Sequence, residues 1–331
     1  MKTIALIACS NGYGHIRRLL LLAHALSNKG ANPVLFAPLN VVESVVKSEG
    51  IIRPKIVDFD THTNQESWLN GTATDWINFA PNFSGFDIVI SDNLIEILLV
   101  RPDAWLSGSF FWHESLNNFP ENLKLQELSL LRKYKPRMIS SKMFTSDAVK
   151  NYTTLFEVGV YAQKNHTINQ MDKKDALIAC GKGGSIKRQA EEFVKLLATR
   201  EKTKFRQVWV DPDILPYKYP KWMVPATFTH KMYQSILVAV IRPGVGSVTN
   251  SILSKARVFP FFERDNKEMK LNAVRIQLYG IGENTHTINN AWYQAELFMS
   301  NKKNQAKHFK QSQRIDIDGA QQAADIILKS T

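Results

Sequence analysis

The sequence predicts an α/β fold of two domains, each with a parallel β-sheet covered by helices on both faces. Three observations predict it: the length of 331 residues, a repeated apolar run with a glycine-rich turn behind it, and further apolar runs that alternate with helical patterns. The repeat is literal at its start, because residues 5–9 and 176–180 both read ALIAC. An apolar run, a glycine turn and a helix open a parallel α/β unit, so we expect one such unit at the start of each half.

The other elements follow this plan in chain order. In the first half we expect a glycine turn, a helix and two further strands, at 10–14, 16–28, 33–36 and 87–90. In the second half we expect a turn, a helix, two strands, a second glycine turn and its helix, at 181–185, 186–199, 207–210, 236–241, 242–250 and 247–255. The predicted organisation is an N-terminal domain over 1–158, a polar linker over 159–174, a C-terminal domain over 175–310 and a helical tail over 311–331.

Composition excludes several classes of protein. With 44% hydrophobic and 22% charged residues, the chain is neither disordered nor collagen-like, and no uncharged apolar run reaches the roughly 18 residues of a spanning helix. Two cysteines, Cys9 and Cys180, exclude a disulfide framework and a cysteine-based zinc site. The apolar run before Cys9 is shorter than the roughly 7–15 residues of a secretory signal, so we expect a cytoplasmic protein.

The net charge of +12 favours an anionic partner: nucleic acid, anionic lipid or a phosphorylated ligand. The basic clusters at 132–135 and 302–303 are short and typical of a solvated surface. Without a zinc finger, an RNP-type motif or a basic helix, the sequence does not support binding to nucleic acid.

Glycine turns behind strands are the candidate ligand sites, because they bring backbone N–H groups to a helix N-terminus that favours anions. The turn at 181–185 lacks Walker spacing, and Gly12 and Gly14 do not continue into a dinucleotide fingerprint. The turn at 242–250 lies behind another strand of the same predicted sheet, where ligands of open α/β sheets bind. Two such turns suit a diphosphate, as in a nucleotide-sugar, although a tight turn without a ligand remains the structural alternative.

Several of these motifs together resemble a known family. They are GYGHIRR at 12–18, FTHKMY at 228–233, RPGVGSVT at 242–249, Glu268-x-x-x-Asn272-Ala273 and GIG at 280–282. In this order they look like the GT-B glycosyltransferases, most of all the N-acetylglucosaminyltransferase of peptidoglycan lipid synthesis and the UDP-sugar hydrolase of pseudaminic acid synthesis.

The resemblance implies a GT-B fold, with two Rossmann-like domains facing across a cleft, the first on the acceptor side and the second binding a nucleotide-sugar. The residues that it implies for the diphosphate are Gly181, Gly183, Gly184, Ser185, Gly244, Gly246 and Ser247. His230 and Met232 would lie near the base, Glu268 would reach sugar or ribose hydroxyls, and Asn272 completes the donor set. Two positions depart from the family: Asn250 replaces an acidic residue and Met269 replaces a glutamine, which puts donor affinity in doubt.

Inverting transfer needs a base and groups that stabilise the leaving diphosphate. His15 is the candidate base, and Asp92 would orient it or bind the acceptor, while helix packing for His15 and an N-cap for Asp92 are the structural alternatives. Arg242 or Lys182 would stabilise the leaving group. No Asp, Glu or His cluster indicates a metal site.

Five further residues are expected on the acceptor side: Gly12, Gly14, Arg17, His113 and Glu114. Arg17 and Arg18 could meet an anionic acceptor, or lie solvated on the helix surface. His113 and Glu114 could touch the acceptor or simply end a strand.

The predicted function is a metal-independent, inverting glycosyltransferase that uses a nucleotide-diphosphate sugar, with UDP as the expected nucleotide, in bacterial surface-glycan or glycolipid synthesis. A glycan or lipid-linked acceptor is expected, with peripheral membrane contact as a possibility. Two alternatives stay open: a nucleotide-sugar hydrolase in which His15 activates water, and a non-catalytic nucleotide-sugar-binding subunit.

Overall fold

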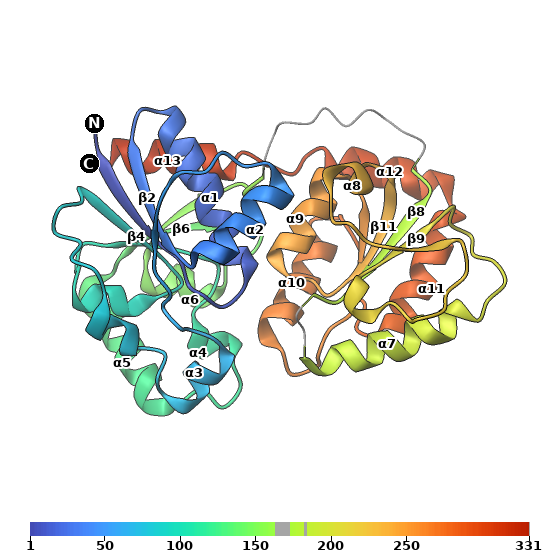
Figure 1. Cartoon of the computed structure of the whole chain (residues 1–331), viewed down its shortest axis with the longest axis horizontal. Helices are drawn as coiled ribbons and strands as arrows, with labels where there is room; N and C mark the ends of the chain where they lie inside the picture. Colours follow the sequence, from blue (N-terminus) through green and yellow to red (C-terminus); the bar gives the residue numbers. More distant parts are fainter. Residues whose placement is uncertain (163–172, 182–183, 331) are drawn as a thin grey trace. The chain divides into compact units, whose positions relative to one another are not determined.

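A computed structural model describes residues 1–162, 173–181 and 184–330. The chain divides into two compact units. Unit 1 comprises Met1–Gln163 and Asp316–Thr331, and unit 2 comprises Lys164–Ile315. Each unit is described by itself below (Figure 1).

Unit 1 contains a seven-stranded sheet in the order β3-β2-β1-β4-β5-β6-β7, and its strand pairs are parallel. Its strands are β1 (Thr3–Ile7), β2 (Asn32–Ala37), β3 (Lys55–Asp58), β4 (Ile88–Asp92), β5 (Trp105–Ser107), β6 (Arg137–Ser141) and β7 (Thr154–Val158). Its α-helices are α1 (Tyr13–Asn28), α2 (Leu39–Glu49), α3 (Gln65–Asn70), α4 (Trp112–Ser115), α5 (Glu121–Tyr134), α6 (Asp147–Tyr152) and α13 (Gly319–Lys329). Two 3-10 helices complete it, η1 (Asp75–Phe79) and η2 (Ile95–Leu99).

Strand β1 is buried on both faces of this sheet. Ile4 and Leu6 pack in one hydrophobic cluster, while Ala5 and Ile7 pack in a second. Side chains of a strand alternate between faces, so a strand with helices on both sides reads as a continuous apolar run.

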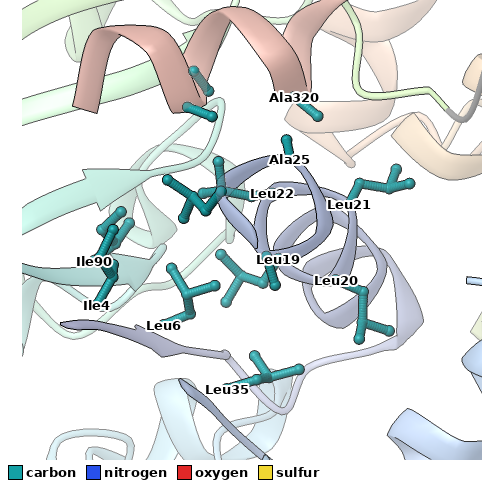
Figure 2. Close-up of a cluster of buried hydrophobic side chains, with 14 of the residues drawn as sticks. Ile4, Leu6, Leu19, Leu20, Leu21, Leu22, Ala25, Leu35, Ile90 and Ala320 are labelled. Atoms are coloured by element: carbon teal, nitrogen blue, oxygen red, sulfur yellow. The ribbon is translucent and has the colours of Figure 1, made fainter. Parts of the chain in front are cut away.

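The final helix, α13, completes unit 1. It packs against α1 and β7, and its Ala320 side chain faces the α1 layer around Ala25 (Figure 2). The approach to the strand layer is close: a Cβ at Gly319 would lie 2.2 Å from the carbonyl oxygen of Gly159. The C-terminal segment therefore belongs to the N-terminal unit, a docking that the sequence left open.

Unit 2 contains a five-stranded parallel sheet in the order β10-β9-β8-β11-β12. Its strands are β8 (Asp175–Ala179), β9 (Val208–Val210), β10 (Met223–Pro225), β11 (Ile236–Ile241) and β12 (Arg257–Pro260). Its helices are α7 (Gly184–Ala198), α8 (His230–Ser235), α9 (Val245–Leu253), α10 (Lys267–Leu278), α11 (Ile288–Met299) and α12 (Lys302–Ser312), with the 3-10 helix η3 (Pro212–Ile214).

The predicted fold class is confirmed: two parallel sheets with helices, each opened by a strand, a glycine turn and a helix. The ALIAC repeat, however, is offset by one residue between the units, because β1 ends at Ile7 whereas β8 ends at Ala179. As a result, Leu6 packs with α1, but it is Ile178, not Leu177, that packs with α7. The repeated letters mark equivalent strands without occupying equivalent faces.

The segment expected as a linker, 159–174, begins as part of unit 1. Val160, Tyr161 and Ala162 are buried in unit 1, and Tyr161 forms a β-bridge with Asp318. Residues 163–172 lie outside the described part of the chain. Among the described residues, no helix is long and apolar enough to cross a membrane.

Candidate functional site

The first turn of α1 carries His15. Gly12 is the N-cap residue, with a φ of 99°, and Gly14 lies in the first turn with open space where a Cβ would point. The turn before it is held by hydroxyls from the segment after β3: Ser10 N–H donates to Thr63 at 3.1 Å. The strand-to-helix turn is thus fixed by its neighbours, and it places His15 beside the end of β4.

His15 is bound by a buried carboxylate. Its Nδ1 lies 2.6 Å from Oδ1 of Asp92, the last residue of β4, whose side chain is fully buried. An ionised carboxylate only accepts hydrogen bonds, so Nδ1 carries the proton and the lone pair of neutral His15 lies on Nε2. This is the tautomer that a general base needs.

Arg18 binds the same carboxylate. Its Nε donates to Oδ2 of Asp92 at 2.7 Å and its second terminal nitrogen to Oδ1 at 2.6 Å. Burial by itself would raise the pKa of Asp92, but the Arg18 charge and the hydrogen bonds from His15 and Arg18 outweigh it and hold that pKa below its usual value. From the sequence, Arg18 was expected to meet an anionic acceptor or to lie solvated on the helix surface. Its spacing of three residues from His15 puts both side chains on one helix face, and this spacing could have indicated that they share a partner.

The other residues expected on the acceptor side have structural partners. Arg17 is buried in α1. Glu114 accepts hydrogen bonds from the Phe111 N–H at 2.9 Å and the Ser146 hydroxyl at 2.8 Å. His113 pairs through Nδ1 with Glu127, and burial lowers the pKa of His113. The ring centroid of Trp112, the residue before His113, lies 5.9 Å from that of His15.

Glu96 and Glu127 form a pair of neighbouring buried carboxyl groups, and Glu127 is the partner of His113. Glu96 is fully buried beside Trp76 and Glu127, and Oε1 of Glu127 has no hydrogen-bond partner among the described residues. Burial, reinforced by the neighbouring Glu127, raises the pKa of Glu96 well above its usual value. Burial also raises the pKa of Glu127, to about 8. Sequence reasoning missed both groups, since single glutamates in helical segments read as surface residues.

In unit 2, the two glycine turns start side by side. Strands β8 and β11 are parallel neighbours, and their last residues, Ala179 and Ile241, are register partners. The N–H of Arg242 donates to the Ala179 carbonyl at 3.0 Å. The turn before α7 and the turn before α9 therefore leave the same edge of the sheet together.

Both turns are open where they are described. A Cβ at Gly181, Gly244 or Gly246 would meet no atom within 4 Å. Gly244 is the N-cap of α9 and supplies no side-chain hydrogen bond to it, so the first N–H groups of that helix have no capping side chain from this position. Gly184 and Ser185 begin α7, whereas Lys182 and Gly183 lie outside the described residues.

Two side-chain contacts hold the second turn. Arg242 donates through Nε to both oxygens of Glu263, at 3.1 and 3.2 Å, a partner that the sequence analysis did not identify. Asn272, expected to bind the donor, is buried and donates to the Pro243 carbonyl at 2.9 Å. Its contact is with the turn itself, which it fixes to α10.

The remaining residues expected to bind the donor lie on α8, α9 and α10. His230 is half-buried at the start of α8 and contacts Gln234 at 3.1 Å. Met232 has its side chain buried, so it could offer only its backbone to a base. Ser247 and Asn250 are half-buried in α9, and Glu268 is half-buried in the first turn of α10.

Asp211 brings a negative charge to the same edge. It follows β9, and its Oδ2 accepts the Gly181 N–H at 3.3 Å. Burial raises the pKa of Asp211. Within the described parts of the chain, no group of three or more His, Cys, Asp or Glu residues could hold a metal ion.

Comparison with known proteins places this geometry in context. No family model matches the chain, and no curated protein matches it. Solved structures do match over almost the whole chain. MurG of Acinetobacter baumannii is 14% identical with a TM-score of 0.58, covering 99% of both chains. LpCGTa in complex with UDP is 14% identical with a TM-score of 0.66, also covering 99% of both.

A third similar structure is the Streptomyces sp. SF2575 glycosyltransferase SsfS6 complexed with thymidine diphosphate, which is 12% identical with a TM-score of 0.61 and covers 99% of this chain and 100% of that one. This chain has the GT-B fold. The resemblance of its motifs to GT-B glycosyltransferases is thereby confirmed at the level of the fold, including the similarity to a MurG protein.

Proposed function

We propose that this chain is a glycosyltransferase that moves a sugar from a nucleoside diphosphate to an acceptor hydroxyl. The observation that carries the proposal is the His15–Asp92 pair, a histidine held through Nδ1 at 2.6 Å by a buried carboxylate. A histidine oriented in this way is suited to act as a general base, and the chain also has open glycine turns suited to a diphosphate.

The proposed reaction is a single displacement. Nε2 of His15 takes the proton of the acceptor hydroxyl, whose oxygen forms a bond to the anomeric carbon of the sugar. The bond from that carbon to the diphosphate oxygen breaks, and the nucleoside diphosphate leaves with the electron pair. One displacement inverts the anomeric configuration.

Unit 2 would bind the leaving group. The N–H groups of Gly246 and Ser247 at the start of α9 would hydrogen-bond the diphosphate, as would Gly183, Gly184 and Ser185 of the other turn. Gly181 and Gly244, also expected to bind it, have their N–H groups bonded to Asp211 and to the Arg242 carbonyl, so they would only leave room for the phosphates. The helix dipole would stabilise the developing charge in place of a metal ion. Arg242 would add a positive charge, oriented by its contact with Glu263.

UDP is the proposed nucleotide, supported by the motif resemblance and by the UDP-bound and thymidine diphosphate-bound structures of the same fold. His230 and Met232 would contact the base, with Asn250 and Glu268 near the ribose or sugar. For the acceptor we propose a surface glycan or a lipid-linked glycan made in the cytoplasm. The net charge of +12 supports an anionic acceptor or an anionic membrane surface.

Calorimetry with UDP, thymidine diphosphate, GDP and CMP tests the donor site, and release of UDP from UDP-sugars with and without candidate acceptors tests the chemistry. We expect His15→Gln to bind UDP normally and to lose turnover. His24→Gln is the matched control, because His24 lies on the same helix and contacts Asn28 instead of Asp92.

Three outcomes contradict the proposal in different ways. Failure of all four nucleotides to bind refutes the donor site. Release of free sugar without an acceptor identifies a hydrolase in which His15 activates water. Donor binding without turnover over a broad acceptor panel identifies a non-catalytic binding subunit.

A further inference from the structure

Three ionisable groups meet at the start of α1, although a base and its orienting carboxylate would need only two. Arg18 takes both oxygens of Asp92, at 2.7 and 2.6 Å, and its terminal nitrogen lies 3.4 Å from Nδ1 of His15. The side chain of Asp92 is completely buried, and those of His15 and Arg18 are 12% and 13% exposed. Water therefore screens these interactions only weakly.

The consequence follows from counting charges. A histidine beside a lone carboxylate is stabilised in its protonated form, because protonation creates an ion pair. Here the Asp92 charge is already neutralised by Arg18, so protonation of His15 adds a net positive charge next to an existing cation. Such an arrangement favours the neutral imidazole, which is the form that accepts a proton.

We propose that Arg18 is a positioning residue of the His15–Asp92 pair: its guanidinium fixes the carboxylate and offsets its charge, so that His15 stays neutral and able to act as a base. This inference rests on the proposed function, because it assigns Arg18 a role through a base that the proposed function names. It applies to the charge balance of the site, whichever acceptor is used.

Among the described residues, the groups that lie near His15 and Asp92 from other elements are neutral. From β5, the Ser107 hydroxyl donates to Oδ2 of Asp92 at 3.3 Å and carries no charge. From α4, Trp112 contributes a neutral ring. The buried phenol of Tyr161 is within electrostatic range of Arg18 and Asp92. Burial raises its pKa above its usual value, so the phenol is neutral at every pH at which a histidine titrates. Cys9 also interacts electrostatically with Asp92, and it is neutral because burial raises the pKa of its thiol to about 12.

The test is the titration of His15 by NMR on isotope-labelled histidine in the full chain, without donor or acceptor. The chain has eight histidines, and the His15 signal is identified by its absence in His15→Gln. We expect Arg18→Gln to raise the midpoint of His15 by about 1 to 3 pH units, since an opposing cation is lost. Asp92→Asn should lower it, and Arg18→Lys should keep it near the wild-type value.

The double variant R18Q/D92N decides the matter even if Arg18→Gln alone does not fold, because it leaves no unpaired buried charge. If the two charges offset one another, His15 in the double variant titrates near its wild-type midpoint. If it titrates as in Asp92→Asn alone, or if a folded Arg18→Gln leaves the midpoint unchanged, Arg18 has no such role and the proposal is overturned.

A second readout links the charge balance to activity. For a base that must be neutral, the acid limb of the kcat/KM profile of Arg18→Gln should move to higher pH, with activity recovered above it, while a merely structural defect lowers kcat/KM at every pH. Absence of UDP binding or turnover in the wild type would refute the proposed function and leave the titration of His15 as an independent result.

Discussion

Replacing Gly246 by alanine separates the stability of unit 2 from its capacity to bind a diphosphate. Gly246 is the second residue of α9, and a Cβ at this position would meet no atom within 4 Å. Alanine in a helix is more stable than glycine by roughly 0.5–1 kcal/mol, because the unfolded glycine has more conformational freedom. The fold should therefore tolerate Gly246→Ala, with unchanged or slightly increased stability.

Donor binding should respond in the opposite direction. The added methyl group would occupy the open space at the start of α9, where a phosphate must approach the backbone N–H groups. Loss of one hydrogen bond to a charged group costs about 1.5–3 kcal/mol. This corresponds to a roughly 10- to 150-fold weaker affinity for UDP.

Gly14→Ala is the matched control. Gly14 is the second residue of α1, and it also has open space at its Cβ position, but it lies in unit 1. Thermal denaturation and calorimetry with UDP measure both properties of each variant. We expect both variants to keep their stability and Gly14→Ala to keep wild-type affinity. Equal UDP affinity of Gly246→Ala and the wild type would refute a diphosphate site at the start of α9.

Three further predictions concern unit 1. Because burial raises the pKa of Glu127 to about 8, the folded state holds this proton more tightly than the unfolded chain, so the stabilisation is complete at low pH and is lost as pH rises toward 8. In denaturant unfolding from pH 5 to 8, the free energy of unfolding should decline less with pH in Glu127→Gln than in the wild type. An equal decline in both would contradict the raised pKa of Glu127. A Cβ at Gly108 would lie 1.5 Å from Oδ1 of Asn93, so Gly108→Ala should lower Tm sharply, and N93G/G108A should regain part of that loss; no regain would exclude the clash as the cause. Ile327→Ala, at a fully buried position of α13, should cost about 2–5 kcal/mol of unfolding free energy, and a cost near zero would show that α13 does not pack on unit 1.

The sequence by itself determined the fold class. Continuous apolar runs such as 236–241, short and bounded by glycine turns, predict strands covered on both faces, and the glycine turns behind them lead into helices. These are local signals of composition and period, and they sufficed to predict two parallel sheets and the turns at 181–185 and 242–250. They also identified His15 and Asp92 as a candidate pair, since each follows a predicted strand of one sheet.

Only the tertiary structure decided which side chains meet. Arg18 on Asp92, Glu263 on Arg242 and Asn272 on the Pro243 carbonyl join elements that are distant in sequence. The same holds for α13, which lies at the end of the chain and packs beside α1 and β7 of the N-terminal unit (Figure 1).

The physical reason is that a polar residue in a helix or loop carries no local mark of its partner. Arg18 has the same sequence signature whether it faces water or a buried carboxylate. Its role depends on the register of β4 against β1, which brings Asp92 to the start of α1. That register depends on packing of the whole sheet, so the charge balance around His15 is a property of the folded unit.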